Sequence, residues 1–95
     1  MANRKEYIDK LAAQLKQWDD EIEKLEAKAQ QAQTDVKADY QRQLEELRSK
    51  RQKAENRIQE IREASEDAWQ ELKSGAEEAF DSMRNAVDNA VSRFK

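Results

Sequence analysis

The sequence predicts an all-α protein: an elongated helical hairpin or coiled coil, with a long first helix over about residues 3–63 and a shorter amphipathic second helix over about residues 66–94. Two observations lead to this prediction. Apolar residues recur at helical spacing along nearly the whole chain, and the 95 residues are 41% charged, with one Gly and no Pro. With a mean hydropathy of -1.25, such a chain is expected to form one unit that buries a narrow seam rather than a thick core.

Residues 4–32 carry apolar side chains at alternating steps of three and four. An average step of 3.5 residues places these side chains on one narrow stripe, as in a coiled coil. The second helix is about half as long as the first, so it cannot cover the whole stripe. We therefore predict that the chain associates with itself, as a dimer or tetramer. The surface for this is the N-terminal seam, formed by Ile8, Leu11, Leu15, Trp18, Ile22 and Leu25.

Over residues 36–44 the apolar spacing changes to two successive steps of four. A four-residue insertion of this kind, called a stutter, unwinds a coiled coil locally without ending the helix. Because no Gly or Pro lies nearby to turn the chain, the first helix is predicted to continue through it. The alternative is a turn in QQAQTD, after which Thr34 caps a new helix. The chain would then be a three-helix bundle with breaks near Thr34 and Ser65.

Ser65 is the clearest break in the pattern, because serine is a favoured N-cap and the acidic Glu66 and Asp67 suit the first turn of a helix. Beyond it, apolar residues repeat every eleven positions, which gives a straight stripe wider than the N-terminal seam. Gly75 lies at the polar edge of this stripe, where it is either tolerated or marks the close approach of another backbone. The amphipathic surface of the second helix, the C-terminal face, comprises Trp69, Leu72, Phe80, Met83, Val87, Val91 and Phe94.

The residue types that carry most enzyme chemistry are missing from the sequence. There is no His and no Cys, which excludes an imidazole base, a thiolate nucleophile and the usual zinc ligands. One Gly cannot form a phosphate-binding Gly-rich loop. The acidic cluster of Glu77, Glu78 and Asp81 is typical of a solvated helix surface more than of a cation site. We therefore predict a protein that is not an enzyme and has no cofactor or metal.

The charge pattern narrows the choice of partners. Eighteen basic and 21 acidic residues are interspersed and give a net charge of -3, so no concentrated basic face predicts nucleic-acid binding. No secretory signal or membrane-spanning stretch is visible, and we predict a cytoplasmic protein. A structural or interaction function follows, with the chain itself or another helical protein as partner. The alternative is a peripheral membrane protein that lays residues 66–94 on lipid, although four bases against seven acids in residues 64–95 disfavour anionic lipid.

The C-terminal third carries a family resemblance. The stretch ASEDAWQELKSGAEEAFDSMRNAVDNAVSRFK resembles small bacterial coiled-coil proteins, among them a stress-response family. The likeness is strongest at Ser65–Trp69, at Leu72–Gly75 and at Ser92–Phe94, and it extends more weakly over about two-thirds of the chain. It implies a stress-linked helical protein without an active site. The eleven-residue repeats are also similar to those of exchangeable apolipoprotein helices.

Overall fold

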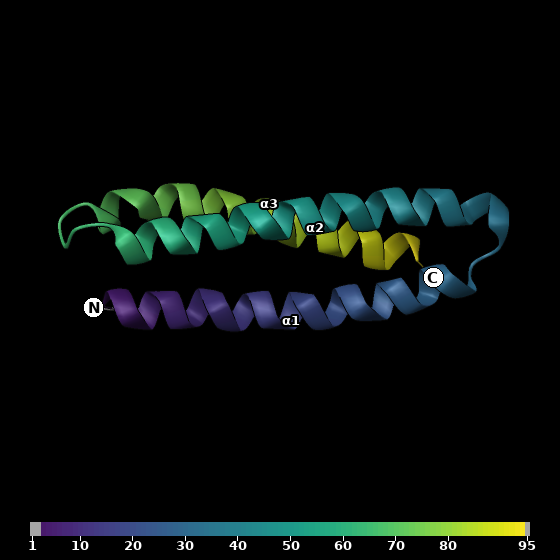
Figure 1. Ribbon diagram of the computed structural model, residues 1–95, viewed down its shortest axis with the longest axis horizontal. Coiled ribbons are helices and arrows are strands. Elements are labelled where there is room, and N and C mark those ends of the chain that lie inside the picture. The colour runs from purple at the N-terminus through teal and green to yellow at the C-terminus, as the bar shows by residue number, and fades with distance from the viewer. Residues whose placement is uncertain (1–2, 95) are drawn as a thin grey trace.

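The computed structural model describes residues 3–94 and shows an all-α chain (Figure 1). Three helices follow one another: α1 (Arg4–Gln31), α2 (Thr34–Glu63) and α3 (Trp69–Arg93). They run up, down and up along a common axis, so that α1 and α3 point the same way. The molecule is a slender bundle of 51 × 18 × 17 Å. The arrangement is therefore the three-helix alternative.

The predicted unbroken helix over residues 3–63 is corrected to two helices, because the chain turns at Ala32 and Gln33. These two residues have extended backbone, with ψ of 153° and 155°. The change in apolar spacing over residues 36–44 thus follows a turn and is not a stutter within one helix. The physical reason is burial: folding back here covers the stripe of α1 within one chain, whereas a straight rod would leave it in water until another copy arrived.

The second turn joins α2 to α3 over residues 64–68, at the break predicted around Ser65. The Ser65 hydroxyl accepts a hydrogen bond from the backbone N–H of Ala68 at 3.2 Å, and the Ser65 carbonyl accepts from the N–H of Ala68 and of Trp69. These bonds form a tight turn before the helix, so α3 begins at Trp69, three residues later than predicted. Serine therefore holds the turn rather than capping α3 directly.

Arg4, at the start of α1, ties that end of the bundle together. Its guanidinium donates to the backbone carbonyls of Ile61, at 3.3 Å, and of Ala64, and it pairs with the Glu66 carboxylate at 2.7 Å. The last carbonyls of a helix lack partners within the helix and attract cations. Arg4 therefore satisfies the end of α2 and fixes α1 beside the second turn.

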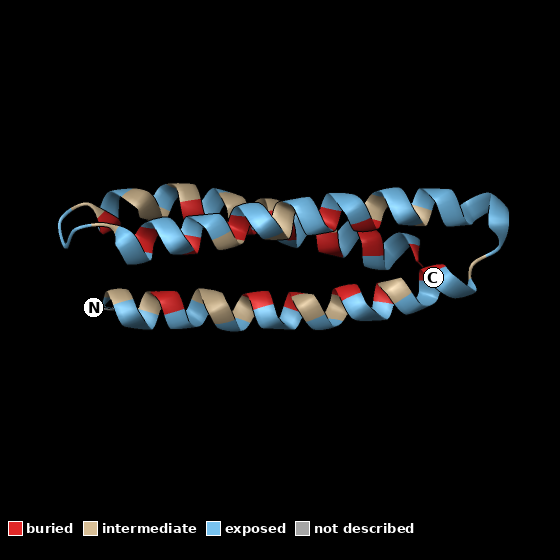
Figure 2. Ribbon diagram, in the orientation of Figure 1, coloured by how far each residue is buried: buried red, intermediate tan, exposed pale blue. Residues whose placement is uncertain are grey.

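The core is one apolar column along the bundle axis, toward which the buried positions of every helix face (Figure 2). Within residues 3–94 no polar or charged residue is fully buried. The free energy gained by hydrophobic burial is proportional to the apolar area removed from water. This apolar column is therefore the main source of stability. From α2 it receives Leu44, Leu47, Ala54, Ile58 and Ile61.

Arg51 interrupts the apolar spacing of α2 with a charge, and the structure shows where that charge goes. The guanidinium reaches α1, where its Nε lies 2.8 Å from a carboxylate oxygen of Asp19, and it also pairs with Glu55 on its own helix. The Asp19 hydrogen bond is the main cause that raises the pKa of Arg51. Partly exposed ion pairs add little stability, but this one aligns α1 with α2.

Replacing Gly75 with Ala is expected to stabilise the bundle by about 0.5–1 kcal/mol, because glycine is costly inside a helix. An added methyl group would lie 3.8 Å from the Arg57 side chain, which is ordinary contact. Urea unfolding followed by circular dichroism measures the change. The bulkier, β-branched Gly75→Val is the control, and it should gain less. A loss of stability with Gly75→Ala would mean that α2 and α3 require the bare backbone.

Candidate functional site

The N-terminal seam lies inside the closed bundle. Five of its six residues are buried within a single chain, and Leu11 is half-buried against the core. Trp18 shows the arrangement: it is 5% exposed, and its ring centroid lies 5.4 Å from that of Phe80 on α3. The seam is therefore covered by α2 and α3, and it offers no free surface while the bundle is closed.

The C-terminal face is covered in the same way, with one exception. Trp69, Phe80, Met83, Val87 and Phe94 are buried, and Leu72 is half-buried. Val91, near the end of α3, keeps 38% of its surface exposed. The exposure of Val91 shows that the bundle does not close completely along this side of α3.

The open side is a groove between α1 and α3. The packing of α3 against α2 is extensive, whereas α3 meets α1 at far fewer positions. The resulting hollow, here called the α1–α3 groove, has a volume of about 540 Å³ and adjoins a second hollow of about 300 Å³ nearer the N-terminus of α1. The first is lined by Gln14, Gln17, Trp18, Asp20, Glu21, Lys24, Val87, Asp88 and Val91; the second by Tyr7, Lys10, Leu11, Gln14, Glu77, Phe80, Asp81 and Arg84.

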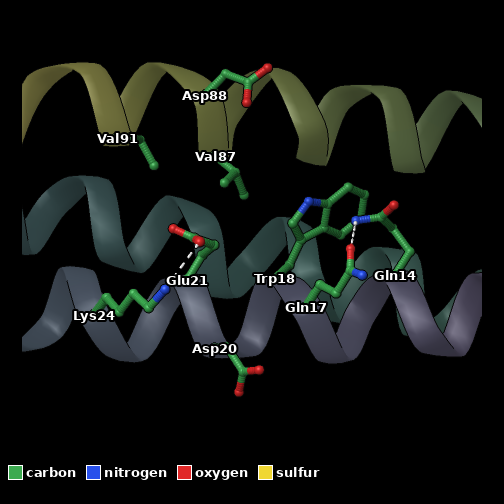
Figure 3. Close-up of a pocket in the computed structure, with 9 residues that line it drawn as sticks. All are labelled: Gln14, Gln17, Trp18, Asp20, Glu21, Lys24, Val87, Asp88 and Val91. Carbon is green, nitrogen blue, oxygen red and sulfur yellow. Dashed lines mark hydrogen bonds and ion pairs between the residues drawn. The ribbon is translucent and has the colours of Figure 1, made fainter.

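The groove has an apolar floor and polar rims (Figure 3). Val87 and Val91 point from α3 toward α1, and the indole of Trp18 faces them from α1. Beside the indole, the Gln14 amide nitrogen donates to the Gln17 amide oxygen at 3.4 Å. Long polar side chains over an apolar floor form the kind of surface on which an amphipathic helix packs.

The rims of the groove are acidic. The residues that line its two parts include three bases and five acids. Two of the bases pair with acids of the same rim, Lys24 with Glu21 at 3.6 Å and Arg84 with Asp81 at 3.4 Å. Asp20 and Asp88 point away from the groove on its two sides (Figure 3). The lining as a whole therefore carries an excess of negative charge.

The sequence does not predict this groove, although it predicts that all three apolar residues of its floor lie on apolar faces. Trp18 belongs to the N-terminal seam, and Val87 and Val91 belong to the C-terminal face, while Gln14 and Gln17 are ordinary polar positions of a helix. The groove exists because α3 packs mainly on α2 and meets α1 at far fewer positions. Helical spacing within each segment carries no information about how two helices pack on each other.

An aromatic cluster closes the groove at the N-terminal end of α1. The Tyr7 ring lies 6.0 Å from the Trp69 ring, and Lys73 Nζ lies 5.2 Å from the Tyr7 centroid and 4.6 Å from the Trp69 centroid. A cation over aromatic faces in this way is attracted to their π electrons. The Tyr7 hydroxyl is inaccessible to solvent and has no hydrogen-bond partner. Burial, and then the nearby Glu77 carboxylate, raise the pKa of Tyr7.

Within residues 3–94, no three His, Cys, Asp or Glu side chains come together in a way that could hold a metal ion. That region includes the acidic cluster of Glu77, Glu78 and Asp81. None of the three described helices contains an apolar stretch long enough to cross a lipid bilayer.

Replacing Tyr7 with Phe is expected to raise stability at neutral pH by up to about 1 kcal/mol, because it removes a buried hydroxyl that lacks a partner. It should also reduce the loss of stability in alkali. The pKa of Tyr7 is raised above 10.0 in the fold, so the neutral phenol is favoured in the folded state. Below pH 10.0 the phenol is neutral in both states and the stability does not depend on its titration; as the pH rises from there through the folded-state pKa, the unfolded chain ionises first and the wild type loses stability.

Melting temperatures of wild type and Tyr7→Phe, measured from about pH 8 to about pH 11, test this. The matched control is Tyr40→Phe, which removes a hydroxyl that donates to the Arg93 carbonyl at 3.2 Å and should lower stability instead. Equal alkaline losses in the wild type and Tyr7→Phe would contradict the assignment.

Comparisons with protein-family models, with curated proteins and with solved structures find no match to this chain. The likeness of residues 65–94 to a bacterial stress-response family accordingly stays a prediction from the sequence. The geometry of the α1–α3 groove is the basis on which a function can be proposed.

Proposed function

We propose that this chain is a non-enzymatic interaction protein, and that the α1–α3 groove receives an amphipathic helix with basic flanks from a partner. The observation that carries the proposal is the half-open floor at Val91. A large apolar side chain keeps 38% of its surface exposed beside the buried Trp18 and Val87. Adding a helix there would turn the three-helix bundle into a four-helix bundle, a stable architecture.

The dimensions of the groove suit one helix. From Tyr7 to Lys24 its α1 rim spans 18 residues, or about 27 Å at 1.5 Å per residue. A partner helix of five turns would fill that length. Its apolar stripe would rest on Trp18, Val87 and Val91, and its flanking residues would meet the two rims, as e and g positions do in coiled coils.

The charge of the rims determines which helix is preferred. The lining has five acids against three bases, an excess of two negative charges that the ion pairs within each rim do not change, and this excess favours Lys and Arg on the flanks of the partner. Opposite charge along an interface raises the association rate and excludes wrong partners more than it raises affinity. A link to stress fits this proposal as a role for such a binding module, and it is carried by the sequence resemblance alone.

Two synthetic amphipathic peptides with the same apolar stripe, one with Lys flanks and one with Glu flanks, test the proposal. In a Trp69→Phe background, Trp18 fluorescence reports on the groove. We expect the Lys-flanked peptide to bind and the Glu-flanked peptide to bind at least about tenfold more weakly, a difference of about 1.4 kcal/mol.

A pair of matched variants locates the binding site of the peptide. Val91→Lys places a charge on the groove floor and should abolish binding of the Lys-flanked peptide. Val36→Lys is the control, because Val36 is equally exposed at 39% but lies outside the groove residues. Binding that survives Val91→Lys, or that fails equally with Val36→Lys, would place the interaction elsewhere.

A lipid surface is the alternative partner, but binding it would require a larger change of the structure. The apolar side chains that α3 would insert, among them Phe80 and Met83, are buried against α2 and α1. They can reach lipid only if α3 leaves the bundle. We therefore expect no blue shift of tryptophan fluorescence when vesicles of neutral or anionic phospholipid are added to the native protein. A shift with either vesicle would favour the membrane alternative over the peptide-binding proposal.

A further inference from the structure

The two turns of the bundle are held in different ways. The second turn has the Ser65 hydroxyl bond and the Arg4 guanidinium reaching it from α1. At the first turn, Gln33 is the N-cap of α2 but makes no side-chain capping bond. The backbone bonds there join near neighbours, such as the Ala32 N–H to the Ala29 carbonyl at 3.2 Å. Local bonds of this kind are easily exchanged for those of a helix.

The first turn is also compatible with helix in sequence. Only Ala32 and Gln33 separate α1 from α2, and both residue types have good helix propensity. No residue from 3 to 94 has a positive φ, so no position in this turn demands a conformation that a helix forbids. Rotating ψ at these two residues would join α1 and α2 into one helix over residues 4–63, about 90 Å long.

The exposed side chain of Val36 is an apolar surface that the joined state could bury. It is an apolar residue in the first turn of α2 and is 39% exposed. One helical turn further on, the Tyr40 ring stacks on Phe94 at 4.0 Å, and α3 ends there, at Arg93. The start of α2 thus extends past the end of α3, and its apolar residue is left without cover from that helix.

We propose that this chain dimerises by exchanging α1 between two copies. The first turn straightens, α1 and α2 become one helix, and the α1 of each copy packs on the α2 and α3 of the other. A joined helix on its own would expose both the stripe of α1 and the core that α1 has left, so it requires a complementary surface. A second copy supplies that surface, residue for residue.

The polar contacts of α1 would be rebuilt between the copies. Asp19 of one copy would pair with Arg51 of the other, as it does within the closed chain. Glu26 would likewise meet Arg48, now 3.1 Å away within one chain. The exchange therefore loses no ion pair, and the two junctions face each other across a two-fold axis. There the two copies of Val36 gain the cover that they lack in the monomer.

This inference is independent of the peptide-binding proposal. An exchanged dimer rebuilds an α1–α3 groove in each half, so a partner helix could bind the monomer and the dimer alike. Failure to bind the Lys-flanked peptide would leave the exchange untouched. A chain that does not dimerise would leave the groove available.

Light scattering on the full chain, concentrated, warmed and cooled, is the first experiment. We expect a monomer of 11.2 kDa in dilute solution and a species of twice that mass as concentration rises. Gln33→Pro should abolish the larger species. A φ of -67° at Gln33 and a ψ of 153° at Ala32 suit a proline in the closed turn. Inside a joined helix the same proline should raise the dimer dissociation constant more than about a hundredfold.

Gln30→Ala is the matched control for the proline variant. Gln30 is an exposed residue of α1 that is helical in the closed and the exchanged form, so its replacement should leave the monomer–dimer balance unchanged. The reverse change, Gln33→Ala with Thr34→Ala, favours helix at the junction and should increase the dimer.

A second experiment distinguishes exchange from any other dimer. The Asp19→Arg variant opposes two cations in its own bundle, and the Arg51→Asp variant opposes two anions. When the two are mixed and annealed, an exchanged heterodimer contains one native pair and one reversed pair, so both clashes disappear. Native mass spectrometry should then show the heterodimer in clear excess over the statistical mixture.

Three results would overturn the exchange. The first is a mass of 11.2 kDa at every concentration. The second is a dimer that Gln33→Pro does not weaken. The third is a mixture of the two charge variants that forms heterodimers only in statistical proportion, because in a dimer built from closed bundles the Asp19–Arg51 pair stays within each chain.

Discussion

Every feature of this protein depends on the need of three apolar stripes to share one core. A narrow stripe such as that of α1 cannot stay in water, and one neighbouring helix covers only part of it. Folding back twice brings three stripes to a common axis within a single chain. Because the core contains no fully buried polar or charged residue among those described, its geometry is set by packing. Its apolar composition alone does not decide which helix lies beside which.

Polar contacts at the rim of the core determine how α1 is aligned along the other helices, which apolar packing alone does not. Apolar stripes of similar spacing can slide past one another by a turn at modest cost, whereas charges that must meet cannot. From the middle of α1, Asp19 pairs with Arg51 of α2. From the beginning of α1, Arg4 donates to the Ala64 carbonyl in the second turn. These contacts lie half-exposed and are weak in free energy. Their effect is to select one alignment of α1 among several with similar apolar burial.

The helical class, the apolar residues of the core and the break around Ser65 could be predicted from the sequence, because each depends on local chemistry or on spacing within one segment. The turn at Ala32 and Gln33 could be predicted only as the alternative, a turn in QQAQTD, since nothing in those residue types forbids a helix. Only the burial gained far away, along α1 and α2, decides in favour of a turn. The α1–α3 groove could not be predicted for a related reason: it results from how little α1 and α3 contact each other in the folded bundle.

The first turn, at Ala32 and Gln33, contains no Gly or Pro. This local feature is the basis of the proposed exchange of α1 between two copies. A Pro at residue 33 would commit the chain to the closed bundle. With Ala32 and Gln33 there, the closed and joined forms contain nearly the same helix and nearly the same core, and they differ in which copy supplies α1. The proposed exchange requires that the two forms differ little in free energy per chain, and concentration would then select between them. A continuous helix over residues 4–63 would form only in that dimer, and the turn at Ala32 and Gln33 would remain in the single chain.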